Sequence, residues 1–180
     1  MRAGQQLSEW SVSQWFNTMQ PMQPAELRGR VVLIHAFQML CPGCVSHGIP
    51  QTVRVREAIP EKDLAVIGLH TVFENHDAMQ PHALAAFIRE YRLKFPIGVD
   101  EPSGHGPIPN TMQQLRLQGT PSVVLLDREG RLRLNHFGLL DDLRLGVMLG
   151  QLLAESAAPV STVPPRSSSP GCTDEGCSVR

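Results

Sequence analysis

Cys41 and Cys44, in the segment LCPGC, are the side chains of this sequence best suited to chemistry. Thiols at this spacing can form a structural disulfide, supply half of a metal site, or exchange electrons by making and breaking an S–S bond. A structural zinc ion needs four ligands, and the predicted folded body contains no second paired motif. We therefore interpret the two cysteines as a redox pair that uses no metal and no cofactor.

The elements around the pair explain how it would be positioned. Residues 31–37, VVLIHAF, predict a buried central strand, and residues 44–59 predict a helix in their second half with a kink at Pro50. Cys41 thus lies where a strand ends and a helix begins, and the N–H groups and partial positive charge of a helix N-terminus favour a thiolate. Cys44 lies one turn further along. We predict an exposed nucleophile, Cys41, and a shielded resolving thiol, Cys44.

The remaining elements alternate in the same way, which predicts an α/β sandwich with helices on both faces of a mixed central sheet. Turn residues at Asp127 to Gly130 predict a hairpin. Leu84, Phe87, Ile88 and Tyr91 share one face of the helix predicted at 77–93, and Gly119 closes the helix predicted at 108–119. The other predicted elements are strands at 64–70 and 95–100, a possible edge strand at 9–17, and a last helix at 141–155.

Composition limits the function classes. The chain has 180 residues, 42% of them hydrophobic, and 16 basic residues balance 17 acidic ones. This balance, with only 5% aromatic residues, predicts no nucleic-acid partner. No apolar run reaches the length of a membrane span, and the polar start carries no signal-peptide pattern, so we expect a cytoplasmic protein without membrane association.

Three segments are expected along the chain. Residues 1–24 form an N-terminal extension with the possible edge strand, and residues 25–156 form the main domain. Residues 157–180 are rich in Pro and Ser and lack hydrophobic periodicity, so they predict a flexible tail.

Five features in this order resemble the thioredoxin superfamily, most closely its TlpA-like and redoxin-like branch. They are the strand 31–37, the CPGC pair, the segment 73–91, the strand 95–100, and the sequence GTPSVVLLDREGRL at 119–132. The resemblance implies a thioredoxin-like fold. It also implies that the Thr120–Pro121 peptide bond is cis, that Pro121 lies against the cysteine pair, and that the backbone of Thr120 can pair with a substrate strand.

Several positions depart from the family. Leu40 replaces the usual aromatic residue, and Pro42 and Gly43 are reversed relative to thioredoxin. His35 stands where thioredoxins carry a buried acid, and two roles are open for it: a buried histidine satisfied by backbone bonds, or a proton relay. His47 stands where many TlpA-like proteins carry Glu, and it is either a solvated residue or one that tunes the pair.

The resemblance implies a thiol-disulfide oxidoreductase that acts on a disulfide-containing protein or small molecule. A thiol reductant or a reductase would supply the electrons. Two alternatives stay open: a peroxiredoxin-like peroxide reductase, and a redox-sensing or adaptor module without turnover. The peroxide reductase is disfavoured because Gln38 and Ile34 stand where peroxiredoxins have Thr and Pro.

A second cysteine pair, Cys172 and Cys177, lies near the end of the chain. Three interpretations compete for it. The two thiols are incidental, they bind a metal with Asp174 and Glu175, or they form a tail redox pair that exchanges electrons with the first pair.

Overall fold

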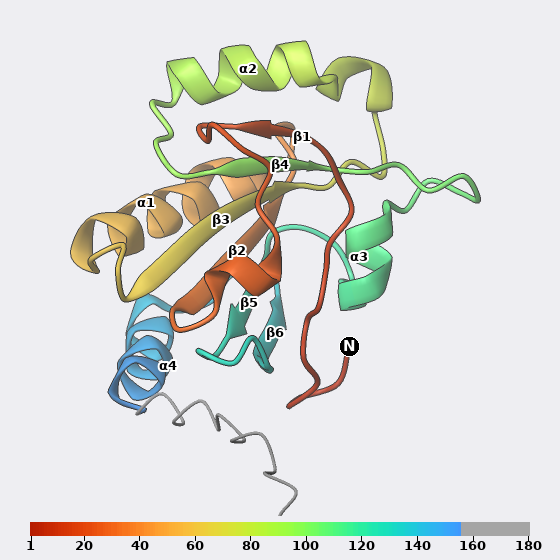
Figure 1. Ribbon diagram of the computed structural model, residues 1–180. Coiled ribbons are helices and arrows are strands. Elements are labelled where there is room, and N and C mark those ends of the chain that lie inside the picture. The colour runs from red at the N-terminus through yellow and green to blue at the C-terminus, as the bar shows by residue number, and fades with distance from the viewer. Residues whose placement is uncertain (156–180) are drawn as a thin grey trace, which may run out of the picture.

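The computed structural model describes residues 1–155, and a six-stranded sheet lies at its centre (Figure 1). The strand order is β1-β4-β3-β2-β5-β6. β2, β3 and β4 run parallel, whereas β1, β5 and β6 pair antiparallel with their neighbours. The sheet is therefore mixed, as predicted. Its strands are β1 (Val12–Phe16), β2 (Val31–Phe37), β3 (Leu64–His70), β4 (Ile97–Asp100), β5 (Ser122–Leu126) and β6 (Leu132–Phe137).

Helices cover both faces of this sheet. The sheet face that carries Leu33 and Phe37 packs against α1, α2 and α4, and the opposite face packs against α3 and the N-terminal segment. None of the helices within residues 1–155 is long and apolar enough to cross a bilayer. The helical elements are η1 (Pro24–Leu27), η2 (Cys44–Gly48), α1 (Ile49–Ala58), η3 (His76–Met79), α2 (Pro81–Glu90), α3 (Asn110–Leu115) and α4 (Asp142–Ala154).

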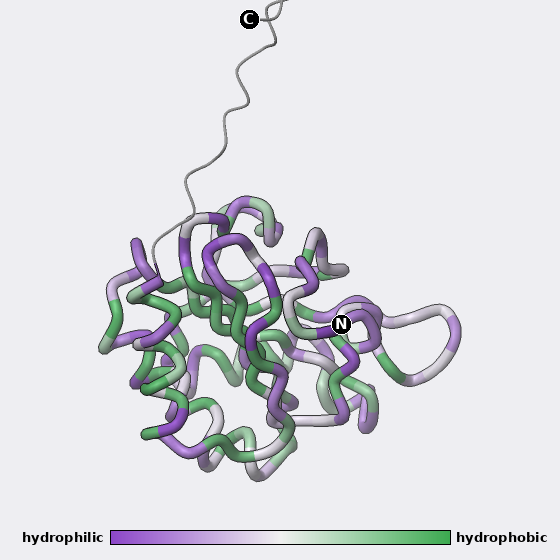
Figure 2. Tube along the Cα trace, turned by 90° about the horizontal axis from the view of Figure 1, so that it is seen from below, coloured by the Kyte–Doolittle hydropathy of each residue, from purple (hydrophilic) through white to green (hydrophobic). Residues whose placement is uncertain are grey.

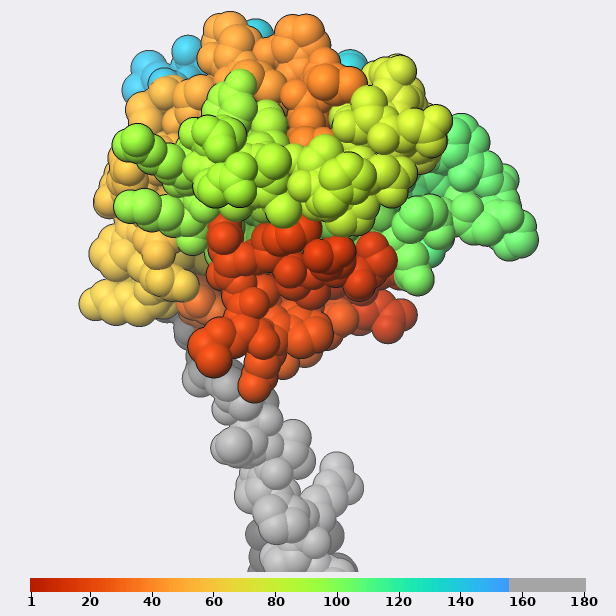
Figure 3. All heavy atoms as spheres, turned by 90° about the horizontal axis from the view of Figure 1, so that it is seen from above, coloured from red at the N-terminus to blue at the C-terminus, as the bar shows by residue number. Residues whose placement is uncertain are grey.

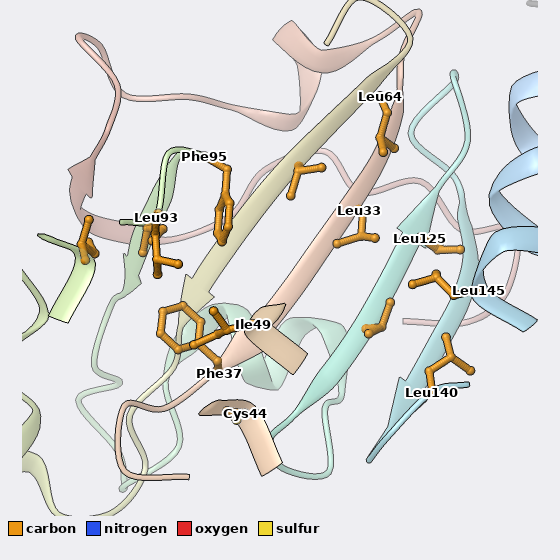
Figure 4. Close-up of a cluster of buried hydrophobic side chains, with 14 of the residues drawn as sticks. Leu33, Phe37, Cys44, Ile49, Leu64, Leu93, Phe95, Leu125, Leu140 and Leu145 are labelled. Carbon is orange, nitrogen blue, oxygen red and sulfur yellow. The ribbon is translucent and has the colours of Figure 1, made fainter. Parts of the chain in front are cut away.

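The central strands are the most hydrophobic part of the chain. Every residue of β2 and of β3 is buried, which is typical of parallel strands covered on both faces. Figure 2 shows these hydrophobic stretches in the middle of the molecule, with hydrophilic segments around them. In the close-up of one core (Figure 4), Cys44 lies with Phe37 and Ile49 at one end of the cluster. The second cysteine is thus part of the hydrophobic core.

The N-terminal segment packs onto the same body. Leu7 and Trp10 are buried in the second core, and the Trp10 Nε1–H donates to the Met22 carbonyl at 2.6 Å. β1 pairs with β4 at the edge of the sheet, and Figure 3 shows this red segment directly beside the green α2. Residues 1–24 therefore contribute both a strand and core side chains.

The helix predicted at 77–93 is divided into η3 and α2. Gln80 is extended because the following Pro81 disfavours helical geometry at the residue before it, and Pro81 then begins α2. Leu84 and Ile88 are buried as expected, but Tyr91 follows the end of α2 and is 49% exposed. Tyr91 still lies on the predicted face, because its ring stacks on that of Phe87 with 4.3 Å between the ring centroids.

The predicted end of the next helix was wrong. α3 ends at Leu115, and its C-cap is Arg116 in a left-handed conformation with a φ of 56°. Gly119 does not close the helix. Its backbone instead lies under Phe137, whose Cε2 is 2.8 Å from the position that a Cβ on Gly119 would take. A side chain at position 119 would collide with this ring.

The helix after the cysteine pair is longer than predicted, and it is widened at its start. η2 is a π-helix in which the Ile49 N–H donates to the Cys44 carbonyl. Pro50 has no N–H, and in an α-helix its ring would collide with the carbonyl of Ser46, four residues earlier. One wider turn relieves such a collision, and π-turns of this kind are frequent at functional sites. The kink predicted at Pro50 therefore takes the form of this π-turn.

Candidate redox site

Cys41 lies just beyond the end of β2, at the start of the helical segment. Its side chain is partly exposed, and its Sγ accepts a hydrogen bond from the Cys44 backbone N–H at 3.3 Å. As a thiol, Cys41 also donates to the Thr120 carbonyl at 3.5 Å. A backbone N–H that points at sulfur stabilises a thiolate, so the geometry suits an accessible nucleophile.

Cys44 lies in a different environment one turn further along. It is completely buried, and both cysteines are free thiols. Burial raises the pKa of the Cys44 thiol to about 12, and its hydrogen bond with Cys41 adds to this increase. Cys44 is therefore protonated at neutral pH and protected from reagents in solution, as expected of a resolving thiol.

The loop before β5 closes over the cysteine pair. The Thr120–Pro121 peptide bond is cis, the geometry that the resemblance implies. The Pro121 Cδ lies 3.4 Å from the position that a Cβ on Gly43 would occupy, so Gly43 permits a close approach between this loop and the CPGC segment. Pro42 is exposed beside them, and its carbonyl accepts a hydrogen bond from the Ser46 hydroxyl at 2.8 Å. Thr120, Pro121, Pro42 and Gly43 thus lie together at the site.

His35 lies below this group, on β2. It is completely buried, and neither ring nitrogen has a hydrogen-bond partner. Burial lowers the pKa of His35 to about 4, so the imidazole is neutral at pH 7. A Cβ on Gly48 would come within 2.4 Å of the His35 Cε1. The ring therefore packs against the backbone of Gly48. It lacks the backbone hydrogen bonds that the first predicted role, a buried histidine satisfied by backbone bonds, required.

His47 lies at the surface of the same region. It is exposed, and its Nδ1 is 2.7 Å from the Ser46 hydroxyl oxygen. His35, His47, Pro121 and Leu140 line one cavity of about 460 Å³ beside the helix. The structure thus places His47 at the site but gives it no contact with either sulfur.

Two buried polar residues near the site were not predicted. Gln38, just before the cysteine pair, directs its Nε2 toward the Thr120 hydroxyl at 3.5 Å and leaves its Oε1 unpaired. His70, at the end of β3, has no partner for either ring nitrogen, and its ring lies 5.3 Å from that of Phe37. The sequence signal for both was a polar residue at or after the end of an apolar strand.

Exposed apolar side chains adjoin Cys41. Leu40, immediately before it, and Leu139 are each 57% exposed, and Phe137 is 49% exposed. The Leu139 Cδ2 is 4.0 Å from the position that a Cβ on Gly43 would take, and the His136 Nε2 is 3.1 Å from the Leu139 carbonyl oxygen. Apolar surface of this kind typically marks a binding site.

The predicted tail pair, Cys172 and Cys177, lies outside the described residues. Within residues 1–155, no group of three or more His, Cys, Asp or Glu side chains is arranged to hold a metal ion.

Comparisons with known proteins agree with the overall fold. A thioredoxin-like superfamily protein of known structure is 52% identical, with 85% of this chain and 99% of the other covered and a TM-score of 0.83. A thiol-disulfide isomerase from Corynebacterium glutamicum is 50% identical, with coverages of 83% and 97% and a TM-score of 0.80. A thioredoxin-like protein solved in its oxidized form shares the fold at 23% identity and a TM-score of 0.70. No protein-family model matches the chain.

A curated relative is much longer than this chain. Protein DipZ of Mycobacterium bovis is 29% identical over 155 residues, which cover 78% of this chain and 21% of DipZ. DipZ of Mycobacterium tuberculosis matches to the same extent. The chain therefore spans about a fifth of the length of the curated relatives it matches.

Proposed function

Because the chain belongs to the thioredoxin-like superfamily, we propose that it is a thiol-disulfide oxidoreductase with Cys41 and Cys44 as its redox pair. The similarity to a thiol-disulfide isomerase supports an oxidoreductase role in general. The assignment of the two cysteines rests on the site itself.

The observation that carries this proposal is the contrast between the two thiols. Cys41 is accessible and receives a backbone N–H, whereas Cys44 is buried, and its burial raises its pKa. A thiol that attacks external disulfides must be accessible and stabilised as a thiolate, and a resolving thiol must be shielded until the mixed disulfide forms. The accessibility of Cys41 and the burial of Cys44 support these two roles.

The proposed reaction moves two electrons. The Cys41 thiolate attacks one sulfur of a substrate disulfide, the substrate S–S bond breaks, and the other substrate sulfur leaves and takes up a proton. Cys44 then loses its proton and attacks the Cys41 sulfur of the mixed disulfide. The second substrate thiolate leaves and accepts a proton, so the substrate gains two thiols while Cys41 and Cys44 become a disulfide.

The surroundings of Cys41 favour a polypeptide substrate. We propose that Leu40, Leu139 and Phe137 bind apolar side chains that flank the substrate cysteine, because each is about half exposed next to the site. A small thiol or a reductase would return the pair to the dithiol state. These partners, and the cytoplasmic location expected from the sequence, are predictions.

Trapping experiments on the full chain test the proposal. We expect the wild type to reduce insulin disulfides in the presence of dithiothreitol, and we expect Cys41→Ser to lose this activity completely. Cys44→Ser should instead accumulate a mixed disulfide between Cys41 and the substrate, visible as a mass increase that dithiothreitol reverses. In the reduced wild type at pH 7, iodoacetamide should label Cys41 at least tenfold faster than Cys44, because Cys44 is buried and protonated.

Three results would contradict the proposal. Faster labelling of Cys44 would reverse the roles of the two thiols. A single turnover without recycling by any thiol reductant would favour the redox-sensing or adaptor alternative. Efficient hydrogen peroxide reduction with slow disulfide exchange would favour the peroxidase.

A further inference from the structure

Gln38 is a buried amide at the candidate redox site, three residues before Cys41. It is 1% exposed, and within residues 1–155 its side chain makes one hydrogen bond, from Nε2 to the Thr120 hydroxyl oxygen at 3.5 Å. Its Oε1 is buried without a partner. An unpaired buried acceptor is an energetic cost that an apolar side chain of the same length would avoid. A role for the Nε2–H group would explain why an amide stands at this position.

Thr120 connects Gln38 with the buried thiol. The Thr120 side chain hydrogen-bonds with the Cys44 sulfur, and this contact lowers the pKa of Cys44, so the hydroxyl acts as a donor to the thiolate. The Thr120 carbonyl serves the other cysteine, because Cys41 donates to it at 3.5 Å. Thr120 thus contacts the two sulfurs through two different groups, and the Gln38 side chain contacts the group that faces Cys44.

The hydrogen of the Thr120 hydroxyl has to be directed, because the backbone around it is held but the hydroxyl can rotate. The Ser122 hydroxyl donates to the Gly119 carbonyl at 2.7 Å, which fixes the chain beside Thr120. A hydroxyl oxygen carries one hydrogen and two lone pairs, and its hydrogen turns to suit its neighbours. The Gln38 N–H occupies one lone pair, so the hydrogen points elsewhere. Within the described part of the chain, the Cys44 sulfur is the other partner of this side chain.

Cys44 needs this donor most after the mixed disulfide has formed. In the free dithiol, burial raises the pKa of Cys44 to about 12, and the hydrogen bond and the charge of Cys41 contribute to the increase. Once Cys41 is joined to a substrate sulfur, it carries neither a charge nor an S–H group, so this contribution is lost. The Thr120 hydroxyl then opposes the effect of burial and stabilises the Cys44 thiolate that attacks Cys41.

We propose that Gln38 is a positioning residue for the resolving step, because its Nε2–H directs the Thr120 hydroxyl hydrogen onto the Cys44 sulfur. The inference rests on the proposed function of Cys41 and Cys44, and it adds a residue that acts through Thr120. The reaction itself is unchanged. Cys44 loses its proton and attacks the Cys41 sulfur, the bond between Cys41 and the substrate breaks, and the substrate thiolate leaves and takes up a proton.

The small disulfide 5,5′-dithiobis(2-nitrobenzoate) separates the two steps of the reaction. The experiment uses the full chain with Cys172 and Cys177 replaced by Ser, so that Cys41 and Cys44 are its only thiols. Mixing the reduced protein with excess reagent should release the coloured thiolate in two phases. The first phase is the attack by Cys41, and its rate should increase with reagent concentration. The second phase is the attack of Cys44 on the mixed disulfide, and its rate should not depend on reagent concentration.

Gln38→Met removes the N–H group and keeps the length of the side chain. We expect it to slow the second phase at pH 7 by about three- to tenfold, and to raise the midpoint of the pH–rate profile by about 0.5–1 unit, because one pKa unit changes the thiolate fraction tenfold below the midpoint. The matched control is Gln51→Met. Gln51 is also buried, and its Nε2 donates to the Leu140 carbonyl at 2.7 Å. Its substitution should leave the midpoint in place.

A double-mutant cycle tests the route through Thr120. Thr120→Val removes the hydroxyl and keeps the branched shape, whereas Thr120→Ser keeps the hydroxyl. Thr120→Val should raise the midpoint of the second phase, and Thr120→Ser should raise it less. Adding Gln38→Met to Thr120→Val should have no further effect, because the group that Gln38 directs is then missing. Fold-changes that multiply in the double variant would overturn the proposal, because Gln38 would then act without the hydroxyl.

The two proposals can fail separately in this experiment. Absence of the first phase from the parent protein would contradict the proposed function of Cys41. If the first phase is present and the second keeps its pH midpoint in Gln38→Met, only the role of Gln38 fails. A second phase that is slowed equally at every pH, in Gln38→Met and Gln51→Met alike, would indicate a purely structural contribution and would also contradict that role.

Discussion

His35 combines complete burial with two unpaired ring nitrogens, which is an energetic cost that the fold carries at its candidate redox site. An unpaired buried polar group typically costs about 1–3 kcal/mol. The pKa of His35 is lowered by burial, whereas that of Cys44 is raised by it. These opposite shifts both make a direct proton transfer from Cys44 to His35 less favourable. These shifts disfavour the relay role at neutral pH, and the missing backbone hydrogen bonds disfavour the other role that the sequence left open.

We predict that His35→Leu increases the free energy of unfolding by about 1–2 kcal/mol, because an apolar side chain of similar size has no nitrogens to desolvate. Resolution of the mixed disulfide by Cys44 should stay within about twofold of the wild-type rate. Urea unfolding measures the free energy of unfolding, and stopped-flow quenching measures the rate of resolution. His70→Leu is the matched control, because it replaces the other buried histidine, which is not part of the CPGC site. A resolution rate that falls at neutral pH only in His35→Leu would instead assign the proton relay.

The sequence predicted the exposure of Cys41 and the burial of Cys44 better than it predicted the polar residues around them. The spacing of Cys41 and Cys44 and the strand before them were sufficient to predict an exposed and a shielded thiol. Gln38 and His70 could not be predicted, because a single polar residue near a strand end does not show whether its side chain turns inward. Their burial depends on contacts with Thr120 and Phe37, which are distant in sequence.

At the scale of elements, α3 depends on a side chain from outside the helix. Pro109, at its N-cap, gives no side-chain hydrogen bond. Asp100, at the end of β4, accepts hydrogen bonds from the Thr111 N–H at 2.8 Å and the Met112 N–H at 2.9 Å, and from the Thr71 hydroxyl at 3.0 Å. The carboxylate therefore performs the role of an N-cap across the fold.

We predict that Asp100→Ala lowers the free energy of unfolding by about 3 kcal/mol, because three buried donors lose their acceptor. The loss should be local first, so amide hydrogen exchange within α3 should accelerate more than exchange within β2. Glu57→Ala, on the exposed side of α1, is the control and should change stability by less than about 0.5 kcal/mol. Uniform acceleration across the sheet would mean that Asp100 supports the whole core and not α3 in particular.

The elements themselves were predictable to different degrees. β2 and β3 were clear, since long apolar β-branched runs have few alternatives to a buried strand. The π-turn before Pro50 was not, because a proline predicts a distortion but not how the helix absorbs it. The end of α3 was missed for a related reason: Arg116 takes a left-handed conformation that glycine usually provides.

For the whole molecule, pH should act mainly through the two buried histidines. Burial lowers the pKa of His35 and of His70 to about 4 from an ordinary value of 6.5. Between these two pH values the unfolded chain binds protons that the folded chain cannot bind. The free energy of unfolding therefore keeps its full value above pH 6.5 and decreases as the pH falls toward 4. Each histidine accounts for about 3 kcal/mol of this loss. Burial raises the pKa of Asp100, which offsets a small part of the loss near the acid end.

We predict a steep decrease in the melting temperature between pH 6.5 and 4, measured by circular dichroism in low-salt buffers. The His35→Leu/His70→Leu double variant should flatten this profile and be more stable than the wild type at pH 4.5. An unchanged slope in the double variant would mean that other groups control the acid sensitivity.

The pairing of the first ten residues has a consequence for synthesis on the ribosome. The Leu7 N–H donates to the Gly130 carbonyl and the Leu132 N–H to the Gln5 carbonyl, both at 2.9 Å, and the Met1 ammonium donates to the Gln114 carbonyl at 3.1 Å. The first ten residues are thus completed by partners more than a hundred residues later in the chain. Such long-range closure slows folding, and Leu7 and Trp10 stay uncovered until β6 has left the exit tunnel. A nascent chain stalled before β6 should therefore recruit chaperones, whereas one stalled after α4 should not.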